Sequence, residues 1–150
     1  MVSEAILAPL AQVEEPADGA WQEWLLTAAM KFRRALLSHR DGARVVAAAQ
    51  SSQVMAEFSE GAMRVLSNRG VPLARARLLL LLVERFTLGL VLEEQTATVT
   101  TTLDPDEAAR RYPLLTSAVH DYFKSGATLD DLYEESVRVI LAQEASKNDV

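Results

Sequence analysis

The stretch that follows Pro72 restricts the possible folds of this chain more than any other segment. It continues to about Gln95 without a proline, and its only glycine is Gly89. Between Leu78 and Leu92, apolar residues occur on nearly every side of the long helix that this stretch predicts. Such a helix must be covered on more than one side. Other helices of one bundle or a second subunit could supply that cover, and both alternatives stay open.

The rest of the chain is predicted to be almost entirely helical. Apolar residues recur at helical spacing, and Pro, Gly and potential capping residues separate the periodic segments. These segments cover residues 3–11, 21–38, 41–48, 52–68, 104–111, 113–124 and 128–144. Asp41 is expected to cap the short helix that follows it, and Thr96–Thr102 is expected to be a polar loop. The length suits one domain, so we predict a single all-α domain over residues 1–150.

Composition argues against several classes of protein. The net charge of −6 is unfavourable for direct binding to nucleic acid. The absence of cysteine excludes disulfides and thiolate sites, and His39 and His120 form no metal-binding motif. The longest uninterrupted apolar run, Leu78 to Val83, is too short to cross a membrane, and the N-terminus does not resemble a signal peptide. A cytoplasmic protein with no membrane association, no cofactor and no metal is therefore expected.

A basic cluster surrounds the end of the second predicted helix. It consists of Arg33, Arg34, Arg40 and Arg44. Cations are favoured at the C-terminal end of a helix, where carbonyl groups lack helical partners. We therefore interpret the cluster as a solvated surface that interacts with helix ends, and not as a DNA contact.

Two runs of sequence carry a resemblance to a known family. They are Phe32–Arg44 and Arg85–Gln95, and their most specific parts are Leu37–Ala43 and Phe86–Gly89. Both runs resemble the effector-binding core of the tetracycline-repressor branch of TetR-family transcriptional regulators. The likeness extends over most of the chain and fails in the variable segment 97–112. TetR-family regulators combine a DNA-binding part with an effector sensor, and this chain resembles the sensor.

The resemblance implies a homodimer. In that family the long helix and the last helix of each subunit pack into a four-helix bundle. The apolar character of residues 78–92 on more than one side fits such an arrangement. The interface residues expected from the resemblance are Leu78, Leu82, Leu88, Leu132, Val137, Ile140 and Leu141.

The resemblance also implies an effector tunnel. It would lie between the second helix, the turn after Gly42 and the two following helices. Phe32 stands where tetracycline-binding members have a tunnel aromatic. Glu93 matches a glutamate that reaches the neighbouring subunit's site and holds a water on the bound magnesium ion. The ligand-binding residues expected from the resemblance are Phe32, Val46, Ala49, Gln50, Ala62, Leu80, Arg85 and Glu93.

The departures from the family pattern concern the polar contacts to drug and metal. Val46 replaces the histidine that ligates magnesium, and Arg85 replaces another histidine near the site. Ala28 and Ala62 replace polar drug contacts, and Ala49–Ser51 replaces a Thr-Arg-Pro turn. Because magnesium needs oxygen or imidazole ligands to offset its dehydration, we expect no binding of a magnesium–tetracycline chelate. The small residues either enlarge an apolar cavity for a hydrophobic effector or let helices pack closely with no cavity.

No segment of the sequence resembles a helix-turn-helix with a basic recognition helix. Residues 1–11 resemble only the end of the helix that connects the DNA-binding part to the sensor. We therefore expect an effector-binding and dimerisation domain of a TetR-class repressor, without its DNA-binding helix-turn-helix. Formation of mixed dimers that antagonise a full-length TetR-class relative is an alternative function.

Two further alternatives remain. One is an enzyme that uses the sensor cavity for chemistry on a hydrophobic substrate, since a fold can be reused. Its only acid–base candidates are Glu93 with Arg85 or His120, and the sequence contains no nucleophile–base pair, metal set or phosphate loop. We therefore predict no catalytic residue and no enzyme. The other alternative is a structural dimer with a filled core.

Overall fold

The computed structural model describes residues 2–12, 14, 20–49, 52–96 and 103–142, which form helices and no strand. The expected all-α class is therefore confirmed for these residues. Of the expected loop Thr96–Thr102, Thr96 is instead the last residue of the long helix. Residues 97–102, the residues after Ala142 and Gln50 lie outside the described residues. The elements are α1 (Val2–Leu7), η1 (Ala8–Gln12), α2 (Trp21–Leu37), α3 (Gly42–Ala48), α4 (Gln53–Asn68), α5 (Leu73–Thr96), α6 (Pro105–Arg111), α7 (Pro113–Lys124) and α8 (Leu129–Ala142).

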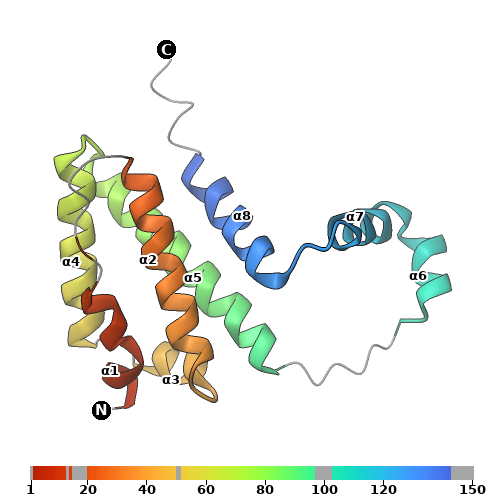
Figure 1. Ribbon diagram of the computed structural model, residues 1–150, viewed down its shortest axis with the longest axis horizontal. Helices are drawn as coiled ribbons and strands as arrows, with labels where there is room; N and C mark the ends of the chain where they lie inside the picture. The colour runs from red at the N-terminus through yellow and green to blue at the C-terminus, as the bar shows by residue number, and fades with distance from the viewer. Residues whose placement is uncertain (1, 13, 15–19, 50–51, 97–102, 143–150) are drawn as a thin grey trace.

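The helices form a compact body and a projecting arm (Figure 1). In the body α5 contacts α2, α3, α4 and α8, while α1 and η1 cover one end of α2, α3 and α4. In the arm α6 and α7 pack on each other, and within the described chain the arm approaches the body through Tyr122 of α7, whose side chain lies beside Glu135 of α8. None of the described helices is both long enough and apolar enough to span a membrane.

The first helix is shorter than expected. The α-helical pattern ends at Leu7 and continues as a 3-10 helix from Ala8 to Gln12. Pro9 explains the change, since proline lacks a backbone N–H and its ring clashes with the preceding helical turn. The tighter helix brings Leu10 into the core, where it is 2% exposed.

The turn between α2 and α3 differs from the expectation that Asp41 caps the short helix. Asp41 has a positive φ of 57° and its side chain makes no capping hydrogen bond. The Gln95 side chain, from the end of α5, accepts from the Ala43 backbone N–H at 3.2 Å and donates to the carbonyls of Leu36 and His39. Gln95 therefore joins the two runs of sequence that carry the family resemblance.

Gly42 is required at this turn for a steric reason. A Cβ atom added to Gly42 would lie 2.2 Å from the backbone oxygen of Leu36. This is far inside van der Waals contact, so only glycine allows the start of α3 to approach the end of α2 so closely. The approach fixes where α3 lies against α5.

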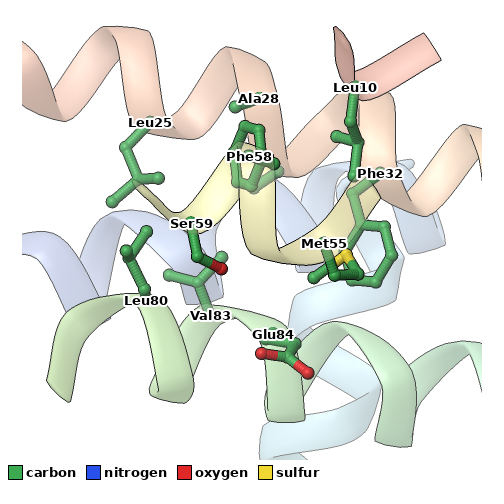
Figure 2. Close-up of a pocket in the computed structure, with 11 residues that line it drawn as sticks. Leu10, Leu25, Ala28, Phe32, Met55, Phe58, Ser59, Leu80, Val83 and Glu84 are labelled. Carbon is green, nitrogen blue, oxygen red and sulfur yellow. The ribbon is translucent and has the colours of Figure 1, made fainter. Parts of the chain in front are cut away.

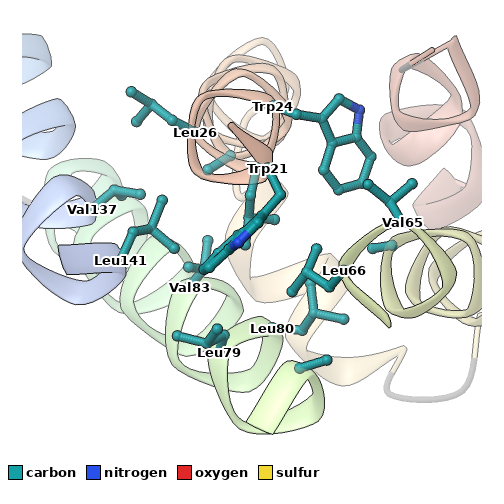
Figure 3. Close-up of a cluster of buried hydrophobic side chains, with 14 of the residues drawn as sticks. Trp21, Trp24, Leu26, Val65, Leu66, Leu79, Leu80, Val83, Val137 and Leu141 are labelled. Carbon is teal, nitrogen blue, oxygen red and sulfur yellow. The ribbon is translucent and has the colours of Figure 1, made fainter. Parts of the chain in front are cut away.

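Two apolar clusters build the core, and α5 contributes to both. The larger cluster packs α2 against α4, α5 and α8, with residues such as Trp21, Leu66, Leu79 and Val137 (Figure 3). The smaller cluster packs α1, η1 and α3 against α2 and the end of α5. Cover from these helices is incomplete, because Leu78, Leu82 and Leu92 of α5 remain exposed.

A buried arginine joins α2, α5 and α8, contrary to its assignment to a solvated surface. Arg33 is 4% exposed and donates two 3.0 Å hydrogen bonds to Glu94, and it also pairs with Asp130. Its guanidinium carbon lies 5.3 Å from the ring centre of Tyr133. Burial would lower the pKa of Arg33, but the hydrogen bonds to the two carboxylates outweigh it and raise the pKa. Helical spacing could not reveal these partners, since they come from distant segments.

Tyr133 extends this contact into the core. Its hydroxyl donates to the backbone oxygen of Ala29 at 3.0 Å and lies 2.7 Å from the hydroxyl of Thr87. Burial raises the pKa of Tyr133 to about 12. The position of α8 on the body is therefore set by a fully bonded polar side chain as well as by apolar packing.

Candidate functional site

An apolar pocket lies between η1, α2, α4 and α5 (Figure 2). Phe32 and Leu80, both expected to bind ligand, line it together with Leu25 and Phe58. The space open to the centre of a water molecule is about 30 Å³, so the side chains nearly fill the pocket. A cavity of that size admits very few water molecules, and a ligand requires the walls to move.

A wider groove lies on the other side of α4, between α3, α4 and α5. Val46, Ala49 and Arg85, three more of the expected ligand residues, line it. The space open to water centres is about 540 Å³, within the usual range of ligand sites. The groove is also more polar than the pocket, since charged side chains such as Glu60 and Arg77 line it.

The pocket and the groove share three lining residues: Met55, Ser59 and Glu84. These three side chains therefore border both spaces. Met55 is partly buried and carries a flexible, unbranched side chain, which can adopt several rotamers at low cost. A single ligand could then occupy both spaces.

Ala62 lies at a separate hollow. This third space lies between η1, α2 and α4, and the volume open to the centre of a water molecule is about 280 Å³. Trp24 and Phe58 line it together with Ala62. The two aromatic rings stack with centres 6.4 Å apart. Ala62 is therefore not brought together with Phe32 or Val46 in one space, although Phe58 borders both the hollow and the apolar pocket.

Two other expected ligand residues are not found at these spaces. Gln50 lies outside the described residues. Glu93 is exposed on α5 and lines neither the pocket nor the groove. The next residue, Glu94, points inward to Arg33, as expected when successive helical residues are about 100° apart. A role for Glu93 in a neighbouring subunit stays a prediction.

The residues expected at a dimer interface fall into two groups. Leu78 and Leu82 are exposed, and Leu132 and Ile140 are half-buried. The other three are buried in contacts within this chain: Leu88, Val137 and Leu141. The sequence could not separate the groups, because apolar residues occupy both faces of α5 and α8.

The candidate acid–base residues are not brought together. Glu93 and Arg85 are on α5, whereas His120 is on α7, which does not contact α5. His120 lies 3.5 Å from Asp121 at an exposed position. Within the described residues no group of His, Cys, Asp and Glu could hold a metal ion.

Sequence reasoning missed most of the residues that line the pocket, and the two that matter most for its border with the groove are Met55 and Glu84. Nothing about methionine in an amphipathic helix marks it as the border between two spaces. Glu84 could have been noticed, since it interrupts the apolar run of α5 directly beside Arg85. It is half-buried where the pocket meets the groove.

Comparison with known proteins places this arrangement in a family. The model of the Tetracyclin repressor-like, C-terminal domain matches residues 14–142. The class E tetracycline repressor of Escherichia coli is 41% identical over 96 residues, covering 63% of this chain and 46% of that repressor. The class A repressor from transposon 1721 of Escherichia coli is 32% identical over 149 residues, covering 93% of this chain and 65% of that repressor. The chain thus spans between 46% and 65% of these relatives' lengths.

Solved structures agree with the sequence relatives. A TetR variant from Acinetobacter baumannii AYE in complex with minocycline superposes with a TM-score of 0.72 at 26% identity, over 95% of this chain and 67% of that one. A possible TetR family regulator from Streptomyces coelicolor A3(2) gives 0.70 at 26% identity, over 96% of this chain and 74% of that one. The expected all-α fold resembling a TetR C-terminal domain is confirmed. The chain belongs to the Tetracyclin repressor-like, C-terminal domain family.

Proposed function

We propose that this chain is the effector-binding and dimerisation domain of a TetR-class transcriptional regulator. The observation that carries the proposal is the apolar pocket at Phe32, which shares Met55, Ser59 and Glu84 with a wide neighbouring groove. Family membership and the relation to repressors support the regulatory role. The effector is a small, mostly apolar molecule, because the walls of the pocket are apolar except for Ser59 and Glu84.

The uncovered apolar surface supports a homodimer. Five residues of α5 form one exposed stripe along the helix: Leu78, Leu82, Arg85, Gly89 and Leu92. Leu129 and Val139 are exposed on the neighbouring α8. Two adjacent helices with exposed apolar stripes can pack against the same pair from a second copy and form a four-helix bundle.

The arm presents a further apolar surface. The exposed apolar residues of α7 are Leu114, Leu115, Val119 and Phe123. Since these four side chains are exposed, this surface is left to water in a single subunit. In the proposed dimer it lies against the partner, which would lower the cost of exposing large apolar side chains.

The regulatory mechanism proposed for the whole protein is a shift between two states of the dimer. An effector that binds one state more tightly changes the affinity of the dimer for its other ligand by the same coupling free energy. Leu10 of η1 lines the apolar pocket, so a ligand there touches the N-terminal segment directly. Mixed dimers with a full-length TetR-class relative would use the same α5 and α8 surface.

Native mass spectrometry of the purified protein tests this proposal. We expect a dimer, with an additional small molecule that is released when the protein is denatured. Ala28→Val adds two methyl groups at the pocket wall and should reduce bound ligand while leaving the dimer intact. A dimer that carries no ligand and binds no hydrophobic probe would favour a structural dimer with a filled core. A monomer would contradict the proposed assembly.

A further inference from the structure

The apolar pocket contains one charged side chain among its described lining residues, that of Glu84. It lies on α5 next to Val83, and Ser59 and Met55 approach from α4 (Figure 2). Glu84 is half-buried. Within the part of the chain that the structure describes, its carboxylate makes no hydrogen bond and no ion pair. A hydrogen-bond acceptor without a donor from the described residues therefore lines an otherwise apolar pocket.

The Glu84 carboxylate differs from the other inward carboxylate of α5 in having no partner among the described residues. A partly desolvated charge costs free energy unless an opposite charge or a hydrogen-bond donor offsets it. The other inward carboxylate of α5, Glu94, has such a partner in Arg33. Arg77 and Arg85 lie on the same helix as Glu84 but form no ion pair with it. A donor supplied by a ligand would therefore improve the environment of Glu84.

The charged side chains of the groove do not by themselves predict whether the ligand is a cation or an anion. Its charged lining residues are Glu60, Glu84, Arg77 and Arg85, two of each sign. Arg77 is exposed, where solvent and salt weaken its field, and Arg85 belongs to the α5 stripe of the proposed dimer interface. Glu84 alone also borders the apolar pocket, so a polar group attached to a buried apolar body meets it first.

We propose that the effector is a hydrophobic amine whose protonated nitrogen donates to the Glu84 carboxylate. This inference rests on the proposed effector site and names the class of its ligand. The apolar body lies against Phe32 and Val83, and Met55 moves aside so that the remainder extends into the groove. The Ser59 hydroxyl, on the opposite wall, accepts a second hydrogen bond from the nitrogen.

Isothermal titration with three probes of one chain length tests the inference: decylammonium, decanol and decanoate at neutral pH. A hydrogen bond between charged groups is stronger than one between neutral groups, so decylammonium should bind about tenfold more tightly than decanol. Decanoate should bind most weakly, because its carboxylate meets that of Glu84. Glu84→Gln keeps the shape of the side chain and should remove the preference for decylammonium.

Glu57→Gln is the matched control. It removes the same charge from an exposed position on α4 that lines neither the pocket nor the groove, so the preference should persist. The comparison of decylammonium with decanol on the unmodified protein does not depend on either variant folding.

The possible outcomes separate the two proposals. Two results would contradict the amine effector but not the effector site itself. In one, decanol binds and decylammonium binds no more tightly; in the other, the preference for decylammonium survives Glu84→Gln. Tightest binding of decanoate would also overturn the amine and would point to Arg77 and Arg85 in the groove. If none of the three probes binds, both the amine and the apolar effector site are wrong.

Discussion

At the scale of single residues, burial changes what a charged side chain does. Arg33 looks like one of four surface arginines in the sequence, yet it is the only one of them that is buried. Its two carboxylate partners differ in exposure: Glu94 is 17% exposed and Asp130 is 68% exposed. Because solvent screens an exposed partner, the two ion pairs should differ strongly in their contribution to stability.

This difference gives a prediction for paired variants. Glu94→Ala leaves the Arg33 charge buried without its main partner and should lower the free energy of unfolding by about 3 kcal/mol. Asp130→Ala should lower it by less than about 1 kcal/mol. Urea denaturation at one fixed protein concentration measures both. Equal losses for the two variants would mean that the buried pair contributes no more than the exposed one.

At the scale of the element, α5 has two different apolar sides. One side packs on the core through Leu79, Val83 and Val91. The opposite side carries the exposed stripe that begins at Leu78 and Leu82. A periodic pattern shows that both sides are apolar, but it does not show which side the chain covers with its own helices.

A charge on the exposed side should weaken the proposed dimer and spare the fold. For Leu82→Glu we expect the dissociation constant of the dimer to rise at least about tenfold, because each subunit then loses an apolar contact and desolvates a carboxylate at the interface. Sedimentation velocity measures the effect, and circular dichroism should remain helical. The control is Leu37→Glu, an exposed leucine at the end of α2 outside the stripe, which should leave dimerisation unchanged. Equal effects of the two variants would contradict an interface on α5.

At the scale of the whole molecule, the residues expected to replace the family's polar tetracycline contacts lie on three separate helices. Ala28 of α2 lines the apolar pocket, Val46 of α3 lines the groove and Ala62 of α4 lines the third hollow. The described residues offer no group of three carboxylates or imidazoles for a metal ion. The fold of the family is thus combined with apolar side chains at these three positions.

We therefore expect no tight, magnesium-dependent binding of tetracycline. Isothermal titration with tetracycline, with and without magnesium chloride, measures this directly. The two titrations should look alike, because Val46 offers no ligand that could offset the dehydration of magnesium. The class A tetracycline repressor serves as the positive control for the assay. Tight binding that disappears when magnesium is removed would contradict the expectation.

The sequence predicted most of the helices, because helix formation follows local periodicity and punctuation. Five of the residues that the resemblance led us to expect at a ligand site line the pocket or the groove, and their contact with a ligand stays a prediction. Sequence reasoning failed where a backbone or side chain depends on a distant partner. The side chain that caps α3 is Gln95 of α5, not Asp41. Ala62 lines a different hollow from the pocket that Phe32 lines.

What the sequence by itself determined is the set of helices, their apolar faces and the family to which the chain belongs. Only the tertiary structure decided which apolar face of α5 is covered, that Arg33 is buried, and that Glu84 borders both an apolar pocket and a groove. The physical reason is that helical periodicity is a local property of the backbone. Burial and pairing depend on contacts between residues that are far apart in the chain, such as Arg33 and Asp130.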